Sequence, residues 1–537
     1  GVAGAKSAKV WSEQSHAWAE GVEPGGAATK SAKDHSLDAG QRADAAADSA
    51  VQAALYDGPK VDTFAELAGV TPAMLGVDGL IRCTESAAVL VRVTSGEDLD
   101  YTGSGGIKLA FKASLAMSPE MAGGDLHLAG QIAERLGVPL FTPEADYEVQ
   151  NAFEPANITW FSANTRIKMM RAGSGGTDPL DSAVYPGSNV KQIGRLRLHL
   201  EDLGAAAAYR AHMLCGRWDT GEGPTNLSFD EIYLEGGHDN CNGVAVASGS
   251  NIRINKIDAG TTTKIGRAFM AHWSNFDDHY LSGGTYQHAP GAGPTVHPHD
   301  IHIGEIVGDI TISSGDFCAL HVVSAGYDVS VGRVSGSVDN SGAGPGNLVL
   351  FTAGDLGMAY GTADDLARGM RGLRVGSVAG SVSSHGINRI GRALYYNADS
   401  TPQSAENYMT KIHDSVDEVV ITGAGNNIQC CVDGHNGRGR SKYGVIKSTS
   451  FRSAIVASNY TRDFNADIIE AIDNQNQGVQ LVGSGATQAD WPEEITIGRL
   501  IVNGTGGSEA TAGQSTVSNI NKIVGLRIGE IIVDKLK

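Results

Sequence analysis

A short phrase that returns along the chain after residue 190 constrains the fold more than any other feature. Apolar and polar residues alternate in it around a glycine, roughly as Φ-x-Φ-Gly-x-Φ. Its clearest copies cover 192–196, 301–306, 329–334, 373–378, 495–500 and 526–531, with weaker copies at 252–257 and 416–421. Self-similarity at a spacing of roughly 25–45 residues indicates a solenoid, in which each repeat stacks on the next.

Each copy of the phrase predicts a strand with one buried face, because its alternation has a period of two. The glycine lies where the alternation changes phase, and Asn255 takes this place in one copy. Glycine and asparagine adopt positive φ more readily than other residues. We therefore expect a bulge or corner with positive φ at this position.

A second apolar phrase lies between successive copies of the first. It covers 266–271, 317–323, 347–351, 391–396, 428–432, 454–457 and 479–482. The segments between the phrases are rich in Gly, Ser and Asp and lack amphipathic helical runs, which excludes βαβ units. The chain is therefore predicted to be all-β, with a right-handed parallel β-helix over 124–537 and an inserted loop region around 272–300.

Composition agrees with a solenoid and excludes several functional classes. The 537 residues include 71 glycines and have a net charge of -19. Nucleic acid would require basic patches, so no nucleic-acid partner is expected. No apolar run approaches the 18 or so residues of a membrane span, and no membrane insertion is expected. Six cysteines without zinc-binding spacing are expected to be small buried hydrophobes.

Residues 1–56 differ from the remainder of the chain. Alanines recur there at heptad-like steps, at positions 32, 39, 43, 46, 50 and 53. A seam of small side chains buries little area, so this segment is predicted to be a helical stalk that needs partner chains. A flexible Ala-rich linker is the alternative.

A small β-rich module is predicted over 57–123, with strands near 81–83, 89–93 and 105–111. Residues 125–136 predict a helix with Asp125 as its N-cap and Gly137 just beyond its C-terminus. Strands at 138–143 and 147–149 are expected to follow.

Three segments resemble a known family. Residues 18–36 are similar to the shaft repeats of phage tail fibres and tailspikes. Residues 63–111 are similar to the small module that precedes many tailspike β-helices, and 125–149 resemble the opening of pectate-lyase-like β-helices. The resemblance implies a homotrimeric bacteriophage tailspike or tail fibre, located in the virion and extracellular after release. It implies attachment to other virion tail proteins through the N-terminal region, and binding and often cleavage of host surface polysaccharide.

Cleavage of a glycosidic bond by hydrolysis needs two carboxylates roughly 5–10 Å apart. A lyase instead needs a base and a cation that neutralises the uronate. The strongest candidate region is 212–305, which holds eight of the 16 histidines and a long Gly/Pro-rich excursion. The candidate catalytic residues are Glu231, Asp277 and Asp278. The candidate glycan-binding residues are Trp273, His279, Tyr280 and Tyr286.

These candidates have structural alternatives. Asp277 and Asp278 also fit a solvated turn or a helix cap. Glu231 occupies an outward slot of the strand phrase, which also predicts one rung of a surface ladder of mixed charge. His297, His299, Asp300 and His302 could hold a metal ion, but a plain loop is favoured because a third ligand is not evident. No cofactor, metal or Ser-His-Asp order is predicted.

The sequence therefore predicts a phage tailspike or tail fibre that binds host polysaccharide and is a candidate depolymerase. A non-catalytic adhesin and a free-standing polysaccharide lyase or hydrolase are the alternatives.

Overall fold

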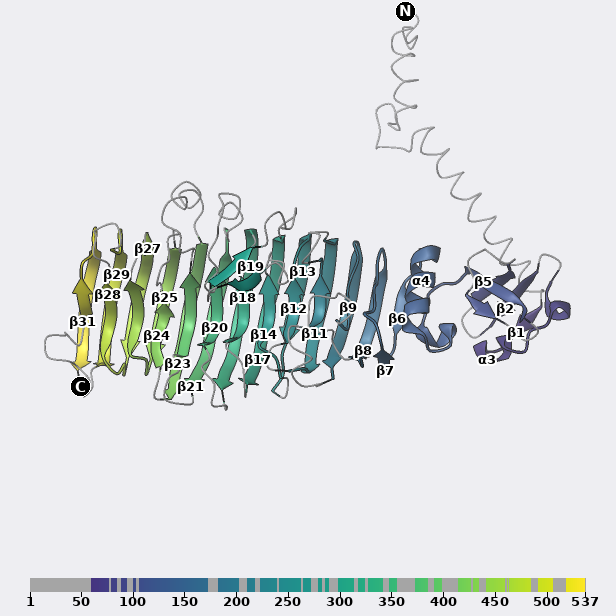
Figure 1. The fold of residues 1–537 in the computed structure, drawn as a ribbon, viewed down its shortest axis with the longest axis horizontal. Helices are drawn as coiled ribbons and strands as arrows, with labels where there is room; N and C mark the ends of the chain where they lie inside the picture. The colour runs from purple at the N-terminus through teal and green to yellow at the C-terminus, as the bar shows by residue number, and fades with distance from the viewer. Residues whose placement is uncertain are drawn as a thin grey trace, which may run out of the picture. The chain divides into compact units, whose positions relative to one another are not determined.

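A computed structural model gives the fold (Figure 1). It divides into two compact units, residues 1–115 and 116–537. The described residues are 59–76, 79–84, 88–93, 100–102, 106–171, 182–201, 210–217, 223–238, 241–261, 264–271, 279–282, 285–288, 298–312, 317–323, 327–340, 347–354, 372–384, 391–397, 414–425, 428–433, 441–458, 461, 463–483, 491–505 and 518–536. The predicted stalk over 1–56 lies outside them.

The first unit contains a five-stranded sheet in the order β1-β2-β3-β5-β4. Its strands are β1 (Lys60–Val61), β2 (Leu80–Cys83), β3 (Ala88–Arg92), β4 (Tyr101–Thr102) and β5 (Lys108–Ala113). The short α3 (Phe64–Leu67) and η1 (Pro72–Met74) lie between β1 and β2 in the chain. Leu67, Leu90 and Phe111 are buried in its core. The three strands predicted for this module are confirmed as β2, β3 and β5.

The second unit is built from two parallel sheets that share the chain alternately. The larger sheet contains β6 (Leu140–Thr142), β7 (Asp146–Val149), β8 (Thr159–Met169), β9 (Val190–Leu200), β11 (Thr225–Gly236), β13 (Ser250–Asp258), β17 (His299–Ile312), β19 (Tyr327–Asn340), β21 (Arg374–Ser384), β23 (Asp414–Gly425), β25 (Ser441–Thr449), β27 (Phe464–Ile472), β29 (Thr496–Thr505) and β31 (Arg527–Leu536). The smaller sheet contains β10 (Ala211–Cys215), β12 (Asn242–Val246), β14 (Arg267–Ala271), β18 (Phe317–Val323), β20 (Asn347–Gly354), β22 (Gly391–Asn397), β24 (Ile428–Asp433), β26 (Ser453–Ser458), β28 (Gln477–Val482) and β30 (Ser518–Asn521).

From β9 onward each strand pairs with the equivalent strand one coil away, so the two sequence phrases form the two sheets. This arrangement is a parallel β-helix, and Figure 1 shows its coils stacked in chain order. The predicted parallel solenoid is thus confirmed, whereas its right-handedness stays a prediction. The one described exception to the stacking is the antiparallel hairpin of β15 (His279–Ser282) and β16 (Thr285–His288).

The core of the β-helix is a set of aliphatic columns that run through the coils. In one column each side chain is the register partner of the next. Its members are fully buried and are Leu196, Ile232, Ile257, Ile306, Val334, Val378, Val419, Ile446, Ile469 and Leu500. The next partner, Ile531 in β31, is 49% exposed because no described coil follows it. Stacking between neighbouring coils therefore supplies the burial that one coil lacks.

The phrase glycines do not have the backbone conformation that the alternation predicted. Among the six clearest copies only Gly194 has positive φ, at 95°. A Cβ on Gly304 would lie 2.4 Å from the Asn255 carbonyl oxygen, and one on Gly332 would lie 2.5 Å from the Gly304 oxygen. The expectation of positive φ was wrong for these positions, since glycine is required there by the close approach of the adjacent coil.

Positive φ is found instead at a corner just before each strand phrase. Asn157, Asn189, Asn226 and Asn251 have φ between 50° and 61°. Each amide Nδ2 of the last three donates to the Oδ1 of the preceding asparagine at 2.8–2.9 Å. Asparagine tolerates the left-handed conformation, and its side-chain amide hydrogen-bonds to the asparagines of the neighbouring coils. This ladder therefore stabilises the same corner in successive coils.

The N-terminal end of the β-helix is closed by α4 (Leu126–Leu136), which follows η3 (Pro119–Ala122). Asp125 Oδ1 accepts from the Leu128 N–H at 3.0 Å, and Gly137 has a φ of 66°, so both predicted caps are confirmed. Phe153 packs against Gly130, where a Cβ would lie 2.8 Å from its ring. The apolar face of α4 therefore covers the first coil.

The asparagine ladder yields a test of the corner. Asn226→Ala should lower the free energy of unfolding by about 1–2 kcal/mol, because it places a Cβ-bearing residue without a local hydrogen bond in the left-handed region. Asn226→Gly keeps the permitted backbone and should cost less, since it loses only the two ladder hydrogen bonds. Denaturant unfolding of both variants measures the difference. Equal losses would contradict a backbone role for this corner.

Candidate functional site

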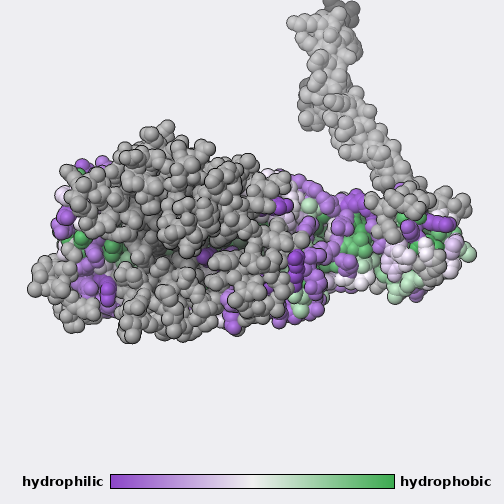
Figure 2. Space-filling view, viewed as in Figure 1, coloured by the Kyte–Doolittle hydropathy of each residue, from purple (hydrophilic) through white to green (hydrophobic). Residues whose placement is uncertain are grey.

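The outward side of the first coils carries a dense network of charged side chains, here named the charged outer face. It is formed by alternate residues of β7, β8, β9, β11 and β13, which the parallel register aligns in rows, and by Glu201 directly after β9. Its members are Asp146, Glu148, Arg166, Lys168, Arg195, Arg197, His199, Glu201, Glu231, Tyr233, Glu235, Lys256 and Asp258. Hydrophilic residues gather over these coils in the space-filling view (Figure 2).

Glu235 is the centre of this network and is only 14% exposed. Its Oε2 lies 2.7 Å from Arg166 Nε, and its Oε1 lies 2.6 Å from Arg197 Nη2. Arg166 also pairs with Asp146 at 3.0 Å. Both oxygens of Glu235 are thus engaged by guanidinium groups from two neighbouring coils. This carboxylate is committed to holding β8, β9 and β11 together.

His199 lies between two carboxylates. Its Nε2 is 3.2 Å from Glu201 Oε2, and its Nδ1 is 3.9 Å from Glu235 Oε2. Burial lowers the pKa of His199, despite these acidic neighbours. The hydrogen bond with His199 and the charge of Lys168 lower the pKa of Glu201, although slight burial opposes them. The His199 ring lies between the Glu201 and Glu235 carboxylates. Their separation is therefore within the roughly 10 Å upper limit for a carboxylate pair that cleaves a glycosidic bond.

The arrangement favours binding over acid catalysis. A general acid needs a raised carboxyl pKa, whereas the pKa of Glu201 is lowered and Glu235 has both oxygens occupied. Glu201 is 41% exposed and is therefore the carboxylate of this pair that a ligand can reach. Fixed guanidinium, imidazole and carboxylate groups offer many oriented hydrogen-bond donors and acceptors to a hydroxyl-rich ligand.

Glu231 lies at the edge of the same face. Its Oε1 is 3.4 Å from Lys256 Nζ and 3.7 Å from Arg195 Nε, residues that are its register partners on the two adjacent strands. The same row continues through Glu305 and Arg333, which pair at 3.5 Å. Glu231 is therefore a rung of a mixed-charge ladder. Its backbone lies four residues, about 13 Å, along the strand from that of Glu235.

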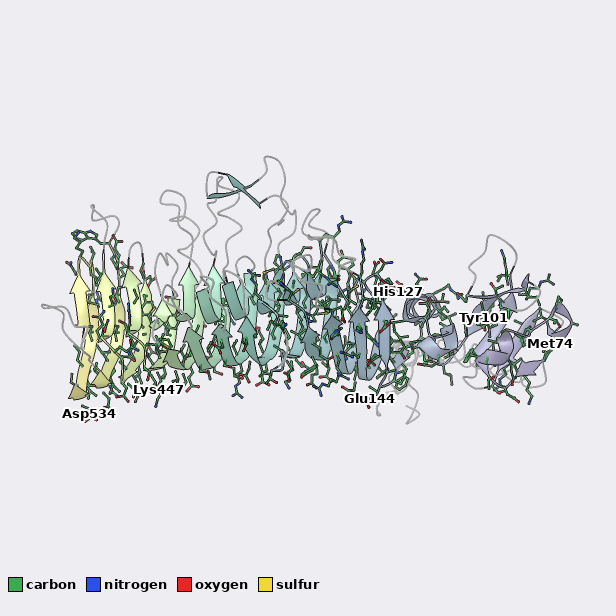
Figure 3. The ribbon with its side chains drawn as sticks, turned by 60° about the horizontal axis from the view of Figure 1, so that its bottom comes forward. Met74, Tyr101, His127, Glu144, Lys447 and Asp534 are labelled. Atoms are coloured by element: carbon green, nitrogen blue, oxygen red, sulfur yellow. The ribbon has the colours of Figure 1, made fainter. Side chains whose placement is uncertain are left out.

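The other predicted site residues belong to the region between β14 and β17. Trp273, Asp277 and Asp278 lie outside the described residues. His279 and Tyr280 belong to β15 and Tyr286 to β16, where Tyr280 pairs with Gln287 and Tyr286 with Leu281. This hairpin lies apart from the stacked coils (Figure 3). The roles of these six residues in binding and catalysis stay predictions.

The candidate metal segment around Pro298 is not the loop that we expected. His299, Asp300 and His302 lie in β17, and His297 lies outside the described residues. His302 Nε2 is 2.8 Å from Asp300 Oδ1. Among the described residues, no group of three or more His, Cys, Asp or Glu side chains has metal-binding geometry. No described helix is long and apolar enough to cross a membrane.

Several buried polar side chains have structural roles. His212 is fully buried, with Nδ1 3.0 Å from the Asn242 carbonyl oxygen and Nε2 2.8 Å from the Glu235 carbonyl oxygen. It is therefore a core histidine with both ring nitrogens hydrogen-bonded. Cys83, Cys215, Cys241, Cys430 and Cys431 are buried free thiols, as expected. Burial raises the pKa of Cys215 to about 12, which makes it unreactive.

The centre of the charged outer face was missed by the sequence analysis. The signal is present in β8 and β9, where charged residues alternate with buried ones in Arg166–Lys168 and Arg195–His199. This alternation does not show which charged residues are neighbours. The strand register does, because it places Arg166 beside Arg197 and Glu235 beside His199.

Comparison with known proteins gives one structural match to report. No family model matches the chain, and no curated protein matches it. The chain is similar to the tailspike protein of Acinetobacter baumannii phage AM24, with 10% sequence identity and a TM-score of 0.29. The similarity covers 88% of this chain and 65% of the AM24 chain, so it spans less than two thirds of that protein.

The position of Glu235 between two guanidinium groups yields a stability test. Glu235→Gln should lower the free energy of unfolding by about 2 kcal/mol or more, because it leaves two half-buried cations without their shared anion. Glu148→Gln is the matched control, since Glu148 is 62% exposed and makes one contact to Lys168 at 3.5 Å. The control should change stability by less than about 0.5 kcal/mol. Similar losses for both would contradict the central role of Glu235.

The environment of His212 yields a pH test. Burial lowers the pKa of His212 to about 4, below its unfolded value near 6.5. The unfolded chain therefore binds the proton first, and His212 stabilises the fold fully above pH 6.5 and loses this contribution as the pH falls to 4. The Tm difference between wild type and His212→Asn should thus shrink between pH 7 and pH 4. A difference that is constant with pH would show that His212 titrates normally.

Proposed function

We propose that this protein is a bacteriophage tailspike or tail fibre that binds a surface polysaccharide of the host bacterium. The N-terminal resemblance to tail-fibre shafts and tailspike modules supports the virion assignment and the attachment to other tail proteins through that region. The parallel β-helix supports it further, because stacked coils give a long, rigid face on which successive sugars can be bound.

The observation that carries binding is the charged outer face. Its side chains are held by ion pairs between coils, so little conformational entropy is lost when a ligand docks. Arg195 lies over the Tyr233 ring, with its Cζ 4.5 Å from the ring centroid, and orients an aromatic surface beside these charges. An oriented aromatic ring next to fixed hydrogen-bonding groups suits a sugar, which has both apolar C–H faces and hydroxyl groups.

Cleavage of the bound polysaccharide is the finer part of the proposal. Asp277 and Asp278 would provide the carboxylate pair, with Glu231 as a further candidate. Trp273, His279, Tyr280 and Tyr286 would hold the sugar near the hairpin. Such inserted segments are where solenoid proteins commonly carry their binding groups.

Binding can be tested on purified capsular and lipopolysaccharide preparations from a panel of bacteria. Tyr233→Ala should weaken the affinity for the recognised polysaccharide about tenfold, a loss of about 1.4 kcal/mol. Arg499→Ala is the matched control, because it removes a rung of the same ladder, to Glu530 at 2.6 Å, in a distant coil. Biolayer interferometry measures both. The absence of binding across the panel, or equal losses for the two variants, would contradict this binding face.

Size-exclusion analysis of the recognised polysaccharide separates cleavage from simple adhesion. Wild type should shorten it, and the double variant Asp277→Asn, Asp278→Asn should not. An intact polymer after incubation with wild type would leave the non-catalytic adhesin as the function. The mass in solution distinguishes the free-standing enzyme, because a homotrimer has three times the 55.8 kDa of one chain.

A further inference from the structure

Asp300, His302 and Ser330 form a hydrogen-bonded chain on the outer surface of β17 and β19. The His302 Nε2 lies 2.8 Å from Asp300 Oδ1, and its Nδ1 is within hydrogen-bonding distance of Ser330 Oγ. Asp300 and His302 are each 45% exposed. Hydroxyl, imidazole and carboxylate therefore follow one another in the order that activates a serine nucleophile.

The fold places these three groups with two separate devices. The parallel register of β17 and β19 makes His302 and Ser330 direct partners on adjacent coils. Asp300 stands two residues before His302 with a φ of 52°, in the same left-handed corner position as Asn251 of the preceding coil. A residue held in this conformation by the coil presents its carboxylate to the imidazole without any loop.

The hydrogen-bond chain sets the direction of proton transfer. The Asp300 carboxylate accepts a hydrogen bond, so the proton of the neutral imidazole resides on Nε2. Nδ1 is then the acceptor for the Ser330 hydroxyl proton. This is the reverse of the ring orientation in the common triad, but each group keeps its role.

Ser330 has a cation on its other side. Arg374 of β21 is its register partner, and the Arg374 side chain is exposed. Among the described residues, no carboxylate pairs with Arg374. A guanidinium beside a nucleophilic oxygen is suited to stabilise the oxyanion that forms when that oxygen attacks an ester.

We propose that Ser330, His302 and Arg374 form a second site that hydrolyses carboxylic esters, with Asp300 as a positioning residue. The Ser330 oxygen bonds to the ester carbonyl carbon while its proton passes to His302 Nδ1, and Arg374 faces the oxyanion. The carbon–alkoxy bond then breaks, and the alcohol leaves with the proton from His302. Water, deprotonated by His302, attacks the acyl-serine, releases the carboxylic acid and returns the proton to Ser330. The reaction needs only ester and water and is independent of glycan binding.

A nearby pair of residues on the same two strands provides the matched control. Ser337 donates to Asp309 Oδ1 at 2.6 Å, and Asp309 is exposed while Ser337 is partly buried. This pair has the same strands and a serine hydroxyl, but it has no imidazole to remove the proton. It is an ordinary polar rung, so Ser337→Ala should not affect esterase chemistry.

The full chain should be treated with a fluorophosphonate probe and analysed by peptide mass spectrometry, and its hydrolysis of p-nitrophenyl acetate should be measured. Wild type and Ser337→Ala should be labelled at Ser330, whereas Ser330→Ala should not be labelled and should lose at least about 100-fold in kcat/KM. His302→Gln should abolish labelling while Ser330 remains present. Asp300→Asn should lower kcat more than it changes KM.

The proposal is overturned if wild type is not labelled at Ser330, or if Ser330→Ala hydrolyses the ester as fast as Ser337→Ala. It is also overturned if His302→Gln is labelled at the wild-type rate. Circular dichroism melting of each variant checks folding. If Ser330→Ala does not fold, it is replaced by Ser330→Thr, which keeps the hydroxyl group but places a methyl group beside it. Polysaccharide binding by Ser330→Ala should be unchanged. The esterase proposal can therefore be wrong while the proposal of glycan binding is right, and the reverse.

Discussion

The structure depends above all on in-register pairing between equivalent strands of successive coils. One coil has too few apolar residues to form a core, but register aligns Ile306 with Val334 and Val334 with Val378, so each aliphatic side chain is covered by its neighbours. The hydrogen bonds and the apolar columns impose the same alignment. A shift by one residue would expose the columns and bring the outward charges into the core.

The same register creates the two surfaces for which we propose a function. Outward residues that are 25 to 38 positions apart in sequence become neighbours, as with Lys256 and Glu231 or Arg197 and Glu235. The charged outer face and the Asp300–His302–Ser330 group are both products of this alignment. They differ in composition, because the first is a closed network of ion pairs and the second places a hydroxyl between an imidazole and an exposed guanidinium. We therefore propose different chemistry for the two surfaces, binding for the first and nucleophilic attack for the second.

Much of the fold was predictable because alternation is a local property. The strand phrases, the caps of α4 at Asp125 and Gly137, and the buried cysteines were all expected from neighbouring residues. The glycine of the phrase was identified correctly as special but for the wrong reason. Its constraint is a carbonyl oxygen of the adjacent coil, such as Asn255 O near Gly304, and no local pattern contains that atom. The corner that does need positive φ lies several residues earlier, where Asn, Asp, Gly or, in one coil, Glu494 precedes the first buried residue of the strand.

The sequence alone determined that this chain forms a parallel solenoid, because the repeat and its alternation specify which residues must be buried. It also indicated Glu231 as a rung of a ladder. Only the tertiary structure decided which outward side chains meet, since coil lengths vary and a difference of one residue changes every partner. Thus His302 and Ser330 are 28 residues apart and occupy the same variable polar position in two copies of the strand phrase, and they are hydrogen-bonded because β17 and β19 pair in this register.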